Sequence, residues 1–148
     1  MNGGFFEIGI YHTKTVENVG TLWRTAYQLG ASGIFTIGKC YPKQASDTVC
    51  AYRHVPMREY LTFEDFKLTR PIGGMLVAIE MNGRPLHTLV HPKQAMYLLG
   101  AEDSGLPTKV LNECNMVVSL ESLRTESYNV AIAGALVMYH RLLTMRLQ

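Results

Sequence analysis

Short apolar runs alternate with longer amphipathic stretches along most of this 148-residue chain. The short runs have the length of buried β-strands, and the longer ones repeat apolar residues at helical spacing. The pattern predicts strands at 5–11, 33–37, 75–79, 95–99 and 116–120, helices at 16–29, 107–114 and 130–143, and a weak helical turn at 62–66. Such alternation is typical of an α/β fold with a mainly parallel sheet and helices on both faces. We expect one domain over residues 1–148, because no linker or repeat interrupts the pattern.

The predicted helix 16–29 gathers its apolar side chains on one side when residues are spaced at roughly 100°. Arg24 falls nearly opposite that side, beside Gly20, and Gly30 is expected to end the helix. The spacing leaves two interpretations of Arg24. It is either an ordinary solvent-facing arginine or a residue that a ligand or second chain approaches across the bare backbone of Gly20.

The predicted helix 130–143 is apolar on all sides for nearly three turns. Such a helix is buried all round, either in the centre of a domain or against a second subunit. A domain of this size seldom encloses a helix completely, so we expect a homo-oligomer. The alternative is a tightly packed monomer core.

Composition and charge narrow the class of protein. Hydrophobic residues make up 47% and charged residues 18%, which excludes wholesale disorder. The net charge of +2 permits a nucleic-acid partner without requiring one. No segment has the roughly 18 apolar residues of a membrane span, and the N-terminus does not resemble a signal peptide. We therefore expect a cytoplasmic protein with no membrane contact.

Several familiar sites are excluded by spacing. The three cysteines have no metal-type spacing and are expected to be reduced thiols; they are Cys40, Cys50 and Cys114. His87 and His91 lie in a stretch that favours extended chain, so they are interpreted as structural histidines and no metal is expected. The chain has no dinucleotide-binding fingerprint and no hydrolase serine elbow. A phosphate loop is also excluded, because Leu106-Pro107 stands where that motif requires Lys-Ser/Thr.

The segment 38–60 interleaves basic and aromatic residues with little periodicity. Such a segment either holds phosphates and stacks bases or forms a solvated loop whose tyrosines pack on the domain, and both interpretations stay open. The residues concerned are Lys39, Tyr41, Lys43, Tyr52, Arg53, His54, Arg58 and Tyr60.

Two polar segments stand where an α/β protein receives a charged small molecule, after a strand and at a helix N-terminus. They are Gly100-Ala101-Glu102-Asp103-Ser104-Gly105-Leu106-Pro107 and Ser127-Tyr128-Asn129-Val130. With Asn18-Val19-Gly20 and Arg24 before them, they form three motifs in a fixed order. In these motifs the chain resembles the TrmH-like branch of the SPOUT methyltransferases over nearly its whole length.

This resemblance implies an open α/β sheet whose C-terminal part threads into a trefoil knot, an exception to the usual rule against knotted chains. It also implies a homodimer that uses S-adenosylmethionine to methylate a ribose 2′-hydroxyl in RNA. By position, Gly100, Leu120, Tyr128 and Ile79 or its neighbour would line the cofactor pocket. The reaction site would comprise Asn18, Arg24, Glu102, Ser127 and Asn129.

The chain departs from the family in the loop 120–126, which lacks the usual proline and glycine and carries two carboxylates and an arginine. A second hypothesis is therefore a non-catalytic RNA-binding or assembly protein that keeps the fold. Among RNAs, transfer RNA is favoured over ribosomal RNA, because the chain is similar to minimal relatives that modify the anticodon wobble ribose. A flavodoxin-like nucleotide-binding protein is disfavoured, because Thr13-Lys14-Thr15 is a poor phosphate loop.

The role of Arg24 follows from guanidinium chemistry. Its pKa, above roughly 12, makes it a poor general base. We therefore expect Arg24 to bind the phosphate beside the target ribose and to stabilise developing alkoxide charge. The ribose proton would leave through water, the phosphate or Glu102.

Overall fold

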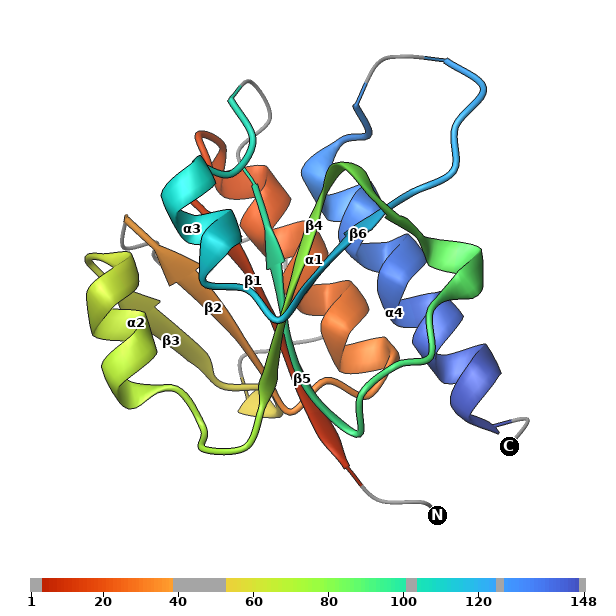
Figure 1. The fold of residues 1–148 in the computed structure, drawn as a ribbon. Coiled ribbons are helices and arrows are strands. Elements are labelled where there is room, and N and C mark those ends of the chain that lie inside the picture. Colours follow the sequence, from red (N-terminus) through yellow and green to blue (C-terminus); the bar gives the residue numbers. More distant parts are fainter. Residues whose placement is uncertain (1–3, 39–52, 101–103, 125–126, 147–148) are drawn as a thin grey trace.

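A central β-sheet carries helices on each of its two faces (Figure 1). The structure is a computed structural model that describes residues 4–38, 53–100, 104–124 and 127–146. One face is covered by α1 (Val16–Gln28) and α4 (Val130–Arg146), and the other by α2 (Phe63–Thr69) and α3 (Thr108–Asn112). The predicted α/β class with helices on both faces is confirmed, and the trefoil knot stays a prediction.

The sheet has six strands in the order β3-β2-β1-β5-β4-β6, and all neighbouring pairs are parallel. The strands are β1 (Phe5–Tyr11), β2 (Gly33–Ile37), β3 (Met57–Tyr60), β4 (Met75–Pro85), β5 (Gln94–Leu99) and β6 (Met116–Ser119). Since parallel strands end at the same edge of a sheet, the loops that follow them lie together. In open α/β proteins this edge is where ligands bind.

Two apolar cores lie on opposite faces of the sheet. Ile8 of β1 packs in the larger core with Leu22 and Trp23 of α1. On the other face, the rings of Phe35 in β2 and Phe66 in α2 stack with centroids 4.7 Å apart. The sheet is thus buried on both sides, which explains why its central strands are continuous apolar runs.

The strand β3 was not predicted, because its sequence has two exposed charged residues at its centre and no apolar alternation. It pairs with β2 at the edge of the sheet. Arg58 of β3 reaches over β2 to the buried carboxylate of Glu7 on β1, at 2.8 Å. Gly33 of β2 leaves room for this contact, since a Cβ there would lie 3.3 Å from the Glu7 carboxyl carbon. Burial raises the pKa of Glu7, and the charge of Arg58 opposes that rise.

Other elements differ from the predicted boundaries. β4 continues past Ile79 to Pro85, with irregular pairing to β6 between Ile79 and Arg84. The weak turn at 62–66 becomes the helix α2, whose N-terminus is capped by the side chain of Thr62. α3 is shorter than the predicted 107–114. A short 3-10 turn, η2 (Leu86–Thr88), follows β4.

Within the single chain, α4 is not buried on all sides. Its inner face packs closely on the core, because Gly134 leaves space that a Cβ would occupy only 2.6 Å from Leu22 Cδ1. Its outer face exposes four apolar side chains at helical spacing, namely Ile132, Leu136, Tyr139 and Leu143. The tightly packed monomer core is therefore excluded as the explanation of this helix, and its outer stripe needs another partner or faces water.

The C-terminal half of α4 is anchored by a buried polar network. Arg141 donates hydrogen bonds to the carbonyl oxygens of Pro92 (2.7 Å) and Lys93 (2.8 Å) and to the Tyr97 hydroxyl (3.0 Å). His91 lies between the Tyr97 hydroxyl at 2.6 Å and His140 Nδ1 at 2.8 Å. His91 is thus a structural histidine, as predicted. Among the described residues no cluster of His, Cys, Asp and Glu could hold a metal ion.

The described part of segment 38–60 packs against the domain. His54 stacks on Tyr27 with ring centroids 4.9 Å apart, and Tyr60 packs edge-on to Phe66 at 5.4 Å. Lys39, Tyr41, Lys43 and Tyr52 lie outside the described residues, so their RNA contacts stay a prediction.

The thiol of Cys114 is free, and burial raises its pKa to about 11. Cys40 and Cys50 lie outside the described residues. Across the described ranges, every helix is too short or too polar to cross a bilayer.

Candidate functional site

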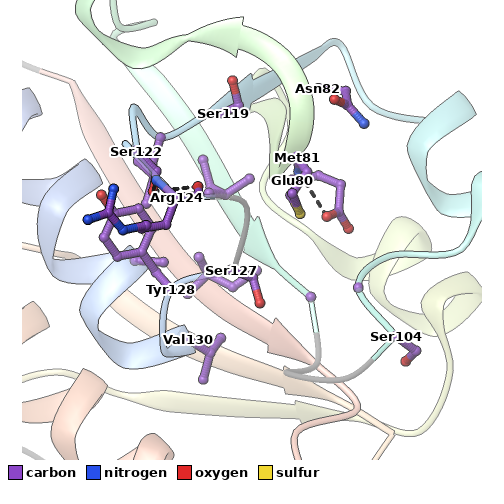
Figure 2. Close-up of a pocket in the computed structure, with 16 residues that line it drawn as sticks. Glu80, Met81, Asn82, Ser104, Ser119, Ser122, Arg124, Ser127, Tyr128 and Val130 are labelled. Atoms are coloured by element: carbon purple, nitrogen blue, oxygen red, sulfur yellow. Dashed lines mark hydrogen bonds between the residues drawn. The ribbon is translucent and has the colours of Figure 1, made fainter.

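A cavity of about 490 Å³ opens at the carboxyl ends of β5 and β6 and beside residues 79–82 of β4 (Figure 2), and we call it the strand-end cavity. The start of α4 closes one side of it. The described residues that line it are Ile79, Glu80, Met81, Asn82, Leu99, Gly100, Ser104, Gly105, Ser119, Leu120, Ser122, Arg124, Ser127, Tyr128, Val130 and Ala133. Its volume lies in the range of pockets that hold a ligand of cofactor size.

The strand-end cavity has an apolar part and a polar part. Leu99, Val130 and Ala133 are buried core residues that present apolar surface to it. Hydroxyl and charged side chains line the remainder, chiefly from the part of β4 that follows Ile79, the end of β6 and the loop after β6. A ligand with an apolar end and a polar or charged end fits this division.

Two glycines allow the described ends of the loop after β5 to approach each other closely at the cavity wall. A Cβ on Gly100 would lie 2.7 Å from the Gly105 carbonyl carbon, and a Cβ on Gly105 would lie 2.3 Å from Glu80 Oε2. Gly105 also has a φ of +64°, a conformation that side-chain-bearing residues adopt only with strain. The glycine spacing of this motif therefore reflects close backbone packing.

Glu80 fixes this loop by hydrogen bonding. Its carboxylate accepts from the backbone N–H of Leu106 at 2.7 Å and from that of Met81 at 2.9 Å. Sequence reasoning expected only that Ile79 or its neighbour would close the pocket. The available signal was a carboxylate directly after a buried strand, a position where an acidic side chain needs a partner.

The loop after β6 is held from two sides at Glu121. Its side-chain Oε2 accepts from the backbone N–H of His87 at 3.1 Å and lies 2.7 Å from His87 Nδ1. Its backbone carbonyl accepts a 2.6 Å hydrogen bond from the Tyr128 hydroxyl. Burial raises the pKa of Glu121, but the hydrogen bonds from His87 outweigh this and lower it overall. These contacts hold the described part, residues 120–124, of the loop that lacks the family's proline and glycine.

Asn129 caps the start of α4. Its Oδ1 accepts from the backbone N–H groups of Ala131 at 3.0 Å and Ile132 at 3.1 Å, as expected of an N-cap. Its Nδ2 donates to Oδ1 of Asn18, near the start of α1, at 3.1 Å. Two of the three motifs therefore meet at the N-termini of adjacent helices.

The structure brings most of the predicted site residues to one edge of the sheet. Five of them line the strand-end cavity, namely Ile79, Gly100, Leu120, Ser127 and Tyr128. Asn18 and Asn129 are hydrogen-bonded to each other beside it. Arg24 lies on the exposed face of α1 and does not line the cavity of its own chain. Glu102 lies outside the described residues.

Comparison with known families gives a match over most of the chain. A sequence profile described as the SpoU rRNA Methylase family matches residues 6–139. A relative from Archaeoglobus fulgidus, an uncharacterized tRNA/rRNA methyltransferase, is 23% identical over 145 residues, which cover 94% of this chain and 65% of the relative.

Solved structures share the fold. An rRNA methyltransferase from Sinorhizobium meliloti with bound AdoMet is 26% identical with a TM-score of 0.81, over 97% of this chain and 58% of that one. A structure that concerns 2-OH methylation of C/U34 on tRNA is 22% identical with a TM-score of 0.84, over 98% and 99% of the two chains. The chain spans less than two thirds of the Archaeoglobus and Sinorhizobium relatives.

Proposed function

We propose that this chain, which belongs to the SpoU rRNA methylase family, is an S-adenosylmethionine-dependent methyltransferase that modifies a ribose 2′-hydroxyl in RNA. The observation that carries the proposal is the convergence of Ile79, Gly100, Leu120 and Tyr128 on one cavity, from strand β4, the loops after β5 and β6, and the entrance of α4. The family resemblance had named these four residues as cofactor ligands. Their role in binding is part of the proposal.

The strand-end cavity fits S-adenosylmethionine in size and chemistry. Its volume of about 490 Å³ is sufficient for a ligand of this class. The apolar surface of Leu99, Val130 and Ala133 suits an adenine ring. The tight approach of Gly100 to Gly105 leaves the cavity wall without side chains at that point, where backbone groups can contact a ligand directly.

Transfer RNA is the substrate we favour, with the wobble ribose of the anticodon as target. Support comes from the extent of the match to the C/U34 tRNA structure, which covers both chains almost completely. The cytoplasmic location expected from the sequence belongs to the same proposal.

The chain's own residues would act by alignment and charge. S-adenosylmethionine carries its methyl group on a sulfonium and so supplies an activated donor. Positioning the ribose oxygen can account for several kcal/mol of the barrier, and Ser127 and Asn129 would contribute to it. Arg24 would bind the neighbouring phosphate through its planar guanidinium and stabilise negative charge on the ribose oxygen. The proton would leave through water, the phosphate or Glu102.

A homodimer forms part of this proposal, because Arg24 lies outside the cavity of its own chain. The exposed stripe of α4, from Ile132 to Leu143, belongs to the same helix layer as α1. A two-fold dimer packed on this stripe buries the same apolar surface twice. It would also bring the Arg24 face of α1 close to a second subunit.

The non-catalytic alternative was motivated by the altered loop 120–126. Glu121 holds the described part of that loop, and Leu120, Ser122 and Arg124 line the strand-end cavity, so no feature of these residues favours a loss of cofactor binding. The alternative remains an outcome of the test.

The test is methyl transfer from isotopically labelled S-adenosylmethionine to unmodified transfer RNA, followed by digestion and mass spectrometry of the nucleosides. We expect a 2′-O-methylated nucleoside at position 34, and no product on a substrate with a 2′-deoxyribose there. Arg24→Lys keeps the charge but lacks the planar fork and should lose most of the rate. A wild-type protein that binds RNA but transfers no methyl group supports the non-catalytic alternative instead.

A further inference from the structure

Arg124 is the one positively charged side chain among the described residues that line the strand-end cavity. It stands in the loop after β6, between the Glu121 anchor and the start of α4, and Figure 2 shows it beside Ser122 and Tyr128. A cation at the wall of a small-molecule cavity is expected to meet a complementary anion, because binding sites place few polar groups and use them for orientation.

The backbone around Arg124 is held in a closed turn. Ser122 Oγ donates to the Arg124 carbonyl oxygen at 2.9 Å and accepts from the Arg124 backbone N–H at 3.2 Å. Glu121, directly before this turn, is fixed by its contacts with His87 and Tyr128. The base of the Arg124 side chain is therefore positioned by hydrogen bonds at both the turn and its anchor.

Among the described residues, the Arg124 guanidinium has a single hydrogen-bond partner. Of its five N–H donors, one makes a long 3.4 Å contact with the carbonyl oxygen of Leu123, and no ion pair of Arg124 with another described residue is found. A planar guanidinium of this kind binds carboxylates and phosphates in a bidentate manner.

Glu80, the other charged side chain of the described lining, disfavours an anion on its own side of the cavity. Its carboxylate already accepts from Leu106 and Met81, and it repels negative charge. The apolar surface near Val130 and Ala133 suits an aromatic ring and not a charged group. Arg124 therefore marks the part of the cavity that suits a carboxylate.

We infer that Arg124 binds the carboxylate of the amino-acid end of S-adenosylmethionine and so selects the intact cofactor over analogues without that group. The inference rests on the proposed function, because it takes the cofactor of that proposal as the ligand. It gives a binding role to Arg124, which lies in the loop 120–126 where this chain departs from the family pattern. The bond is a charge-assisted hydrogen bond, and no covalent step is involved.

Calorimetric titration with two ligands tests this assignment: S-adenosylmethionine and its decarboxylated analogue. The wild-type protein should bind S-adenosylmethionine about 10-fold more tightly than the analogue, as expected for one charge-assisted contact. Arg124→Gln should raise the Kd of S-adenosylmethionine about 10-fold and leave that of the analogue unchanged or lower. Arg124→Lys keeps the charge and should retain part of the preference.

Arg146→Gln is the matched control, because it removes an exposed arginine at the far end of α4. At a rise of about 1.5 Å per residue, that end lies about 24 Å from the start of the helix at the cavity. This variant should change neither Kd, which separates a local contact from the effect of net charge. Circular dichroism and thermal unfolding of each variant show that the fold is retained.

Three results overturn the assignment. An equal loss of affinity for both ligands in Arg124→Gln means that the residue supports the loop and does not contact a carboxylate. Unchanged affinity for S-adenosylmethionine, with weaker binding of transfer RNA, assigns Arg124 to a phosphate of the RNA. Failure of the wild-type protein to bind either ligand overturns the proposed cofactor itself.

Discussion

Asn129 at the start of α4 donates a 3.1 Å hydrogen bond to Asn18 at the start of α1, across 111 positions of sequence. The same Asn129 side chain accepts from two backbone N–H groups of its own helix. One amide therefore caps α4 with its oxygen and joins the two helices with its nitrogen. This shared side chain couples the helix entrance beside the cavity to the helix that carries Arg24.

The two roles of Asn129 can be separated by substitution. Asn129→Ala removes both, and should lower the free energy of unfolding by about 1 kcal/mol through loss of the cap. Asn129→Asp keeps an oxygen that caps the helix but has no N–H for Asn18. Urea unfolding should therefore give Asn129→Asp a stability near that of the wild type, while its methyl-transfer rate falls several-fold. Equal destabilisation by both substitutions would contradict the capping role.

His91 should make stability depend on pH below neutrality. Burial, with the neighbouring His140 and Arg141 charges, lowers its pKa from 6.5 to about 3. As pH falls, the unfolded chain takes up this proton before the folded chain does. The stability that neutral His91 contributes is therefore complete above about pH 6.5 and is lost as pH falls towards 3. The free energy of unfolding should change by up to about 1.4 kcal/mol per pH unit in this range.

Urea unfolding of the wild type and His91→Gln between pH 4 and 7 measures this slope. The variant should be less stable at pH 7 and show a flatter pH dependence. His54→Gln is the control, because His54 is exposed and contacts Tyr27 by ring stacking. An unchanged slope in His91→Gln would assign the pH dependence to other groups.

Gly105 should be essential for the cofactor loop. Gly105→Ala places a Cβ where Glu80 Oε2 now lies and so displaces the carboxylate that holds Leu106. We expect the Kd of S-adenosylmethionine to rise about 10-fold or more, because the charge-assisted hydrogen bond between Glu80 and the Leu106 N–H, which holds the cavity wall in place, is lost. Gly73→Ala is a matched control: its φ is +88° and a Cβ there meets nothing within 4 Å. It should lose roughly 1–2 kcal/mol of stability through backbone strain and leave the Kd unchanged.

The exposed apolar stripe on the outer face of α4 predicts that the protein is a dimer. Leu136→Glu places a charge at the centre of the stripe, which a dimer interface would bury at high cost. Sedimentation should show a dimeric wild type and a monomeric, folded Leu136→Glu. Leu68→Glu introduces the same charge at an exposed leucine of α2 on the opposite face of the sheet and should stay dimeric. A wild type that sediments as a monomer at micromolar concentration would exclude this interface.

The sequence predicted the elements whose pattern is set locally. Five of the six strands and the long helices α1 and α4 follow the apolar pattern, so their positions were expected to within a few residues, apart from the continuation of β4 from Ile79 to Pro85. β3 has no such pattern. It forms because Arg58 can reach the buried Glu7 and because β2 offers a free edge, and both depend on the assembled sheet.

The sequence predicted which residues gather at the cavity where these belong to family motifs. It did not predict the residues whose role depends on contacts between distant parts of the chain. Gly100 and Tyr128 were expected near one another from the resemblance. The importance of Glu80 arises only when the fold brings it to the backbone of Leu106, 26 positions away. Arg124 was visible as a departure from the family pattern, but its place at the cavity wall required the structure.

The most direct test of the central claim is an NMR titration of the isotopically labelled wild-type protein with S-adenosylmethionine. We predict saturable shifts that are largest for the backbone amides of Ile79, Gly100, Leu120 and Tyr128. The amides near Gly73, which precedes β4 at the opposite edge of the sheet, should not move. Saturable binding whose shifts lie away from the strand-end cavity, or no binding at millimolar ligand, would contradict the assignment of this cavity to the cofactor.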